Sequence, residues 1–62
     1  MITLKEAAEK VAEQYKLSSF PISRIRQWIT NGKLKAIKLG RKYYVNPEDL
    51  ESYLLEISQE FN

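Results

Sequence analysis

The fold is decided by residues 21–46, which read PISRIRQWITNGKLKAIKLGRKYYVN. Apolar residues recur at helical spacing in residues 21–31, whereas residues 34–45 alternate with a period of two, as strands do. Gly40 and Arg41 lie inside the alternating part and suit a tight turn with glycine at its first central position. The stretch therefore predicts a helix followed by a β-hairpin, with Arg41 at the hairpin tip.

The predicted helix over residues 21–31 has an inward and an outward face. Pro21 has the fixed φ that suits a helix start, and Gly32 can adopt the left-handed conformation that ends a helix. The inward stripe consists of Ile22, Ile25, Trp28 and Ile29. The outward face is cationic and rich in hydrogen-bond donors, and it consists of Ser23, Arg24, Gln27, Thr30 and Asn31, with Arg26 at its boundary.

The two strands of the predicted hairpin each have two faces. On the first strand, Ile37 and Leu39 face one way and Ala36 and Lys38 the other. On the returning strand, Tyr43 shares a face with Val45 and is expected in the core, which leaves Tyr44 as the more exposed ring. An isolated hairpin is marginally stable in water, so this one should pack on the helices and project its tip outward.

The segment before residue 21 predicts another helix. Thr3-Leu4-Lys5-Glu6 has the form of a capping box. The apolar stripe that follows consists of Leu4, Ala7, Ala8, Val11, Ala12 and Tyr15. Residues 17–21 interrupt the pattern and predict a loop, from which Leu17 and Phe20 are expected to reach into the core.

The segment after residue 45 predicts a third helix. Asn46 is suited to the N-cap, Pro47 to the first helical position, and acidic residues follow at the positive end of the helix dipole. Its expected buried stripe consists of Leu50, Tyr53, Leu54, Ile57 and Phe61. The whole chain thus predicts a single α+β domain over residues 1–62, a compact winged helix-turn-helix in the order helix, helix, β-hairpin (the wing), helix.

Composition excludes several classes of function. A chain of 62 residues has room for one small core, and it contains no cysteine or histidine, so we expect no disulfide, metal site, cofactor or enzyme activity. The carboxylates of the last helix are interpreted as a solvated acidic face rather than as acid-base catalysts. Apolar runs far shorter than a membrane span and the lack of a signal-peptide pattern predict a soluble, cytoplasmic protein.

The charges are distributed unevenly along the chain. Residues 1–20 are neutral overall, and the acids are concentrated in residues 47–62. Residues 21–46 contain no acid and the cations Arg24, Arg26, Lys33, Lys35, Lys38, Arg41 and Lys42. This segregation favours a surface that faces a polyanion, because each cation placed on a phosphate releases counterions. The alternative is an ordinary solvated face.

A helix-turn-helix places its second helix in the major groove of DNA, and a cationic wing tip can reach a minor groove or flanking phosphates. The residues expected to bind double-stranded DNA are Ser23, Arg24, Arg26, Gln27, Thr30, Asn31, Lys33, Lys38, Arg41 and Lys42. In the alternative interpretation of the wing, its cations only protect an exposed sheet edge. Trp28, Tyr43 and Tyr44 could stack on single-stranded bases, but Trp28 lies on the apolar stripe, so core packing is favoured.

Several short motifs together resemble the excisionase-like helix-turn-helix family, which is related to the DNA-binding domain of the MerR regulators. They are ITLKEAA (2–8), IRQWI (25–29), GKL (32–34), AIKLGR (36–41) and PEDL (47–50). The resemblance covers nearly the whole chain and implies a compact winged helix. It also implies that Ser23, Arg24, Arg26 and Gln27 contact the major groove or phosphates, and that Arg41 is directed at a minor groove.

The expected function is that of an excisionase, a recombination directionality factor. Such a protein binds attachment-site DNA, in cooperating copies, bends it, and helps a tyrosine recombinase (integrase) to excise a mobile element. One alternative is a small MerR-like transcriptional regulator of a mobile element, although no long effector segment follows the third helix, so a complete MerR-type regulator is not expected. Another is a protein-interaction module built on the third helix.

Overall fold

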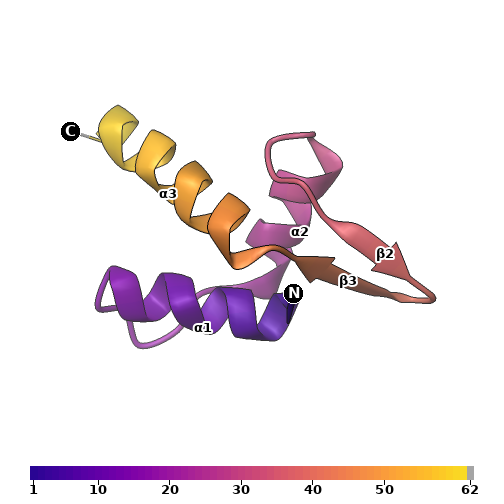
Figure 1. Ribbon diagram of the computed structural model, residues 1–62. Helices are drawn as coiled ribbons and strands as arrows, with labels where there is room; N and C mark the ends of the chain where they lie inside the picture. The colour runs from indigo at the N-terminus through magenta and orange to yellow at the C-terminus, as the bar shows by residue number, and fades with distance from the viewer. Residues whose placement is uncertain (62) are drawn as a thin grey trace.

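The elements of the chain follow the predicted order, with one short strand added at the start (Figure 1). The computed structural model describes the backbone of residues 1–61 and the side chains of residues 1–58. In this part of the chain the elements are β1 (Ile2–Thr3), α1 (Leu4–Gln14), α2 (Ile22–Thr30), β2 (Ile37–Leu39), β3 (Lys42–Val45) and α3 (Pro47–Phe61). The hairpin of β2 and β3 projects away from α1 and α3, as a wing does. The structure thus has the predicted α+β winged helix-turn-helix fold.

Helix α1 begins with the predicted capping box. The Glu6 backbone N–H donates to the Thr3 hydroxyl oxygen (3.2 Å), and the Thr3 backbone N–H donates back to the Glu6 carboxylate (3.1 Å). The helix ends in a Schellman motif, in which Leu17 N–H donates to the Ala12 carbonyl oxygen (2.7 Å). Lys16 occupies the left-handed position of this motif with a φ of 56°. Helix α1 therefore ends with a residue that carries a Cβ in a conformation that favours glycine.

Helix α2 ends as predicted at Gly32, which has a φ of 74°. The Gly32 N–H donates to the Ile29 carbonyl oxygen (3.1 Å) and the Lys33 N–H to that of Trp28 (2.8 Å), which completes a second Schellman motif. At the other end, Pro21 occupies the N-cap position, one residue before the helix, and provides no side-chain hydrogen bond. The start of α2 is therefore determined by the fixed φ of proline rather than by a polar cap.

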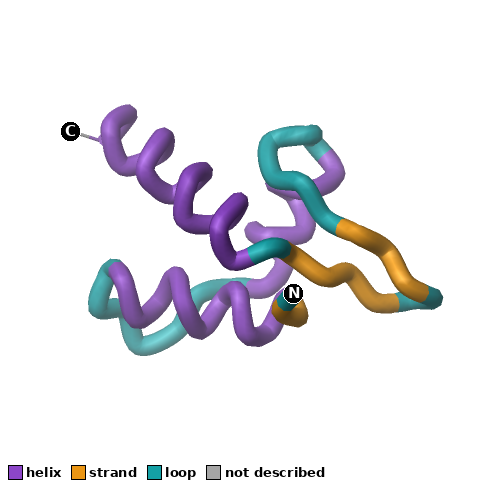
Figure 2. The backbone as a smooth tube through the Cα atoms, viewed as in Figure 1, coloured by secondary structure: helices purple, strands orange, loops and turns teal. Residues whose placement is uncertain are grey.

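The described strands form one antiparallel sheet in the order β1-β3-β2 (Figure 2). Leu39 pairs with Lys42, so Gly40 and Arg41 form the predicted two-residue turn. Gly40 has a φ of 63° while Arg41 has no positive φ, the combination found in type II′ turns. Strand β1 was not predicted; its two residues pair with the end of β3, Ile2 with Val45.

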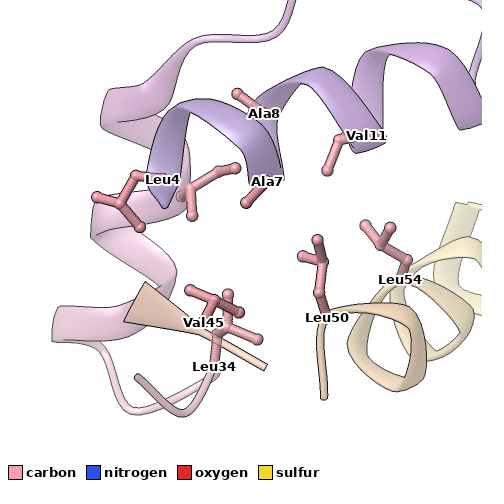
Figure 3. Packing of buried hydrophobic residues seen from close by; sticks show 9 residues of the cluster. Leu4, Ala7, Ala8, Val11, Leu34, Val45, Leu50 and Leu54 are labelled. Carbon is pink, nitrogen blue, oxygen red and sulfur yellow. The ribbon is translucent and has the colours of Figure 1, made fainter. Parts of the chain in front are cut away.

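The core joins one face of the sheet to all the helices. Its buried residues are Leu4, Ala7, Ala8, Val11, Ile25, Leu34, Val45, Leu50 and Leu54. Figure 3 shows Leu50 and Leu54 of α3 pointing toward Ala7 and Val11 of α1. The small alanines let the backbones approach closely. At the start of α3, the Glu48 N–H donates to the Asn46 side-chain oxygen (2.9 Å), as predicted for an N-cap.

The predicted core positions of the aromatic residues are partly confirmed. Trp28 and Tyr43 are half-buried and pack against the core, and so does Phe20. The Trp28 ring lies 5.5 Å from that of Phe20 and 5.0 Å from that of Tyr53, between ring centroids. Tyr15 lies at the edge of its stripe and is 38% exposed, while its hydroxyl donates to the Leu54 carbonyl oxygen (3.3 Å).

Besides Tyr15, two further predicted core residues are exposed. Ile22 is 38% exposed because it lies at the edge of the α2 stripe, next to the wing. Leu17 is 48% exposed; its backbone completes the cap of α1, and its side chain is not part of the core cluster. On α3, Tyr53 and Ile57 pack against the core as predicted, whereas the side chain of Phe61 lies outside the described residues. Ile37 and Leu39, on the outer face of the wing, are also exposed.

Candidate nucleic-acid interface

Helix α2 presents a polar face to solvent because its opposite face is anchored by Ile25, which is completely buried. Ser23 and Gln27 lie roughly opposite Ile25, since each helical residue adds about 100° of rotation. All ten predicted DNA-binding residues are exposed: Ser23, Arg24, Arg26, Gln27, Thr30, Asn31, Lys33, Lys38, Arg41 and Lys42. The Thr30 hydroxyl donates to the Gln27 carbonyl oxygen (3.1 Å), so its own oxygen remains available to accept a hydrogen bond.

A groove of about 370 Å³ runs between α2 and the wing, and we call it the cationic groove. It is lined by Thr3, Leu4, Lys5, Ile22, Arg26, Arg41, Lys42 and Tyr43. Arg26 comes from α2, whereas Arg41 and Lys42 come from the wing tip, so the fold brings the two predicted contact elements together. The type II′ turn holds Arg41 there, because it connects two strands whose register is fixed by pairing.

The electrostatics of the cationic groove follow from its lining. Four of its side chains are cationic, and among the described residues no Asp or Glu lines it. Clustered cations with no nearby carboxylate attract phosphate groups and release their counterions. Two of these cations are arginines, whose planar guanidinium groups bind phosphates and guanine edges through paired hydrogen bonds. The groove is therefore suited to a nucleic-acid backbone with its adjoining base edges.

Of the predicted residues, Arg26, Arg41 and Lys42 line this groove, and the other seven do not; Ser23, Gln27, Thr30 and Asn31 are exposed on α2 and its C-cap outside the lining. Lys33 lines a hollow beside Asp49 and Glu56 of α3. Lys38 extends over the Tyr43 ring, with its ammonium nitrogen 5.6 Å from the ring centroid. Arg24 lines a separate hollow on the opposite flank of α2. Lys33 and Arg24 therefore belong to other surfaces, whereas Lys38 borders the cationic groove through its contact with Tyr43.

Lys5 lines the cationic groove and was not among the predicted site residues. Sequence analysis could only place it on the solvent face of α1, since helical periodicity contains no information about the packing of the wing. A weak signal exists in the resemblance, because Lys5 lies within the ITLKEAA motif.

A metal site or a membrane-spanning helix would indicate a different kind of function. Within residues whose side chains are described, no cluster of acidic residues could hold a metal ion. Over the described part of the chain, none of the helices has the length and apolar character needed to cross a membrane.

The fold is that of a small winged helix-turn-helix with a cationic groove between α2 and the wing. The family model described as "Helix-turn-helix domain" matches residues 1–58, and the chain belongs to this family. Helix-turn-helix domains are typically DNA-binding rather than enzymatic. Comparison with curated proteins and with solved structures gave no match.

Proposed function

We propose that the protein is an excisionase, a recombination directionality factor that binds double-stranded DNA at the end of an integrated mobile element. It bends this DNA and helps a tyrosine recombinase to assemble the complex that excises the element. The helix-turn-helix family and the motifs of residues 2–8 and 36–41 support the proposal. The observation that carries it is the cationic groove, which is lined by both Arg26 of α2 and Arg41 of the wing.

The proposed contacts are divided between α2 and the wing. Ser23, Arg26, Gln27, Thr30 and Asn31 meet base edges and phosphates of the major groove, where arginine and glutamine side chains recognise guanine and adenine. Arg41 and Lys42 reach the neighbouring phosphates or the minor groove, and Lys33 and Lys38 add long-range attraction. Arg24 is left outside the principal contacts because it lines the hollow on the other flank of α2.

Bending and cooperation are linked in this proposal. Bending roughly 20 to 30 base pairs costs on the order of 1–6 kcal/mol, which is large for one domain with few contacts. Neighbouring copies can share this cost through complementary surfaces. Leu55 is 62% exposed on α3 near the exposed Glu51 and Glu56, whereas Ile37 and Leu39 are exposed on the cationic wing. An acidic apolar face of one copy can therefore pack on the wing of the next.

The proposal is tested by an excision assay combined with a bending assay on attachment-site DNA. Adding the protein to a tyrosine recombinase and its integrated element should increase excision, and circularly permuted fragments should show a bend that grows with successive bound copies. Arg41→Ala should reduce both effects, whereas Lys16→Gln, which removes a cation outside the lining of the cationic groove, should not. Repression of a promoter without bending or excision would contradict the proposal and favour a transcriptional regulator.

A further inference from the structure

A second groove lies between α1, α2 and α3, on the flank of α2 away from the wing. In Figure 1, α1 and α3 diverge toward the left of the view. The groove has a volume of about 350 Å³ and is lined by Val11, Tyr15, Phe20, Arg24, Trp28, Tyr53 and Ile57. We call it the aromatic groove. Its volume is at the lower end of the range for ligand pockets, so it suits one large side chain rather than a folded surface.

The walls of the aromatic groove are fixed by ring contacts. The Trp28 ring packs edge-on against the Tyr53 ring at 5.0 Å and is tilted against the Phe20 ring at 5.5 Å, between centroids. Rings from α2, from α3 and from the loop before α2 are therefore in contact. The Tyr15 hydroxyl is occupied by the Leu54 carbonyl oxygen. The groove therefore offers ring faces and edges to a guest, and an apolar or aromatic guest gains most by leaving water there.

Arg24 supplies the charge of this groove. It is exposed, and among the described residues it is the one charged side chain in the lining. Arg24 and Arg26 are two residues apart, which separates them by roughly 200° around the helix axis. The two arginines thus belong to different surfaces. A guanidinium can form paired hydrogen bonds with a carboxylate. Beside an apolar pocket, it therefore favours a ligand in which a carboxylate lies next to an apolar group.

We propose that the aromatic groove docks a segment of a partner protein that presents an aromatic or branched aliphatic side chain beside a carboxylate. The apolar side chain packs against the wall formed by Trp28, Tyr53 and Ile57, and the carboxylate pairs with Arg24. Charge complementarity with Arg24 requires an anionic partner, and the apolar and aromatic lining favours a peptide over a duplex, because a DNA backbone offers phosphates but no apolar side chain to fill the pocket. The docking needs no DNA, and the partner is held on the flank of α2 that faces away from the wing.

Three blocked tetrapeptides test the inference: Glu-Phe-Leu-Glu, Gln-Phe-Leu-Gln and Lys-Phe-Leu-Lys. Trp28 is the single tryptophan of the chain, so its fluorescence reports occupation of the groove. The acidic peptide should bind about fivefold more tightly than the glutamine peptide, as expected for one partly exposed ion pair, and the lysine peptide most weakly. Equal affinities for the three peptides, or no change in emission with any of them, would overturn the proposal.

Two variants of Arg24 test its role in the ranking, and Arg26→Gln is the matched control. Arg24→Gln should remove the difference between the acidic and the glutamine peptides, and Arg24→Glu should reverse the ranking toward the lysine peptide. Arg26→Gln should leave the ranking unchanged. A single-stranded oligothymidylate is the competing probe. If it changes Trp28 emission in an Arg24-dependent way while the acidic peptide does not, the groove stacks bases and the inference is wrong. Because these titrations contain no duplex, their failure is separate from a failure of the excision assay.

Discussion

Arg26 on α2 and Arg41 in the turn between β2 and β3 line the same groove, although they belong to different elements of the fold. Arg26 is held by a helix whose inner side is fixed by Ile25, and Arg41 by a turn whose flanking strands are paired. The two guanidinium groups are thus mounted on separate rigid supports. Each can contact its own phosphate, so the loss of one should leave the other in position.

This relationship predicts the effect of removing either charge. Arg26→Gln and Arg41→Gln should each weaken binding to double-stranded DNA by roughly three- to tenfold near physiological salt, or about 0.7–1.4 kcal/mol. Each should also reduce the slope of log affinity against log salt by about one, since one phosphate contact is lost. Fluorescence anisotropy at several salt concentrations measures both quantities. Lys10→Gln is the control, and an equal loss with this variant would show that net charge alone is responsible.

Two leucines of α3, one buried and one exposed, should differ in their contribution to stability. Leu50 is fully buried, whereas Leu55 is 62% exposed. Leu50→Ala should cost about 2–5 kcal/mol, which is close to the whole stability expected of so small a core. Leu55→Ala should change stability by less than about 0.5 kcal/mol. Urea denaturation followed by circular dichroism compares them, and similar midpoints for the two variants would contradict the described core.

The two Schellman motifs predict opposite effects at their left-handed positions. Gly32 has a φ of 74° and open space where the Cβ of an alanine would lie, so Gly32→Ala should cost about 1 kcal/mol through the backbone alone. Lys16 has a φ of 56°, so Lys16→Gly should stabilise the protein by about 0.5–1 kcal/mol. Thermal unfolding of the two variants tests this. A loss of stability with Lys16→Gly would show that the side chain of Lys16 contributes more than its backbone costs.

The capping box of α1 predicts a pH dependence. The backbone N–H of Thr3, followed by its hydroxyl, lowers the pKa of Glu6 below its ordinary value of 4.5. A lowered folded-state pKa means that this contribution to stability is present above about 4.5 and is lost as the pH falls through the folded value. Glu6→Gln should therefore flatten the stability profile in that acid range. Denaturation midpoints between about pH 3 and 6 provide the measurement, and parallel profiles for the two proteins would refute the assignment.

The helix ends and the wing could be predicted because their signals are local. The Thr3 and Glu6 side chains cap α1 within one turn, Asn46 caps α3, and Gly32 supplies the conformation that ends α2. Each of these contacts joins residues a few positions apart, so the sequence alone contains both partners. Periodicity likewise identified the buried Ile25 and hence the outward face that contains Ser23 and Gln27.

The features that the sequence did not predict depend on tertiary packing. Ile22 follows the apolar stripe of α2 and Leu17 was expected to reach the core from a loop, but neither signal reveals how much of a side chain a neighbouring element covers. Strand β1 has two residues, too few for a period, and exists through its pairing with β3. The angle of the wing against α2 determines which cations share a groove. The cationic groove includes Lys5 and leaves out Lys33.

The pairing of Ile2 with Val45 also has a consequence for the order of folding. Strands β2 and β3 are neighbours along the chain, so their hairpin can close in about 1–10 microseconds. Ile2 must find Val45 across most of the chain, and the entropy of closing that long loop delays the contact. We therefore expect β1 to attach last during refolding. The amide hydrogens that join β1 to β3 should exchange with solvent before those between β2 and β3, so the sheet loosens first at the edge farthest from β2.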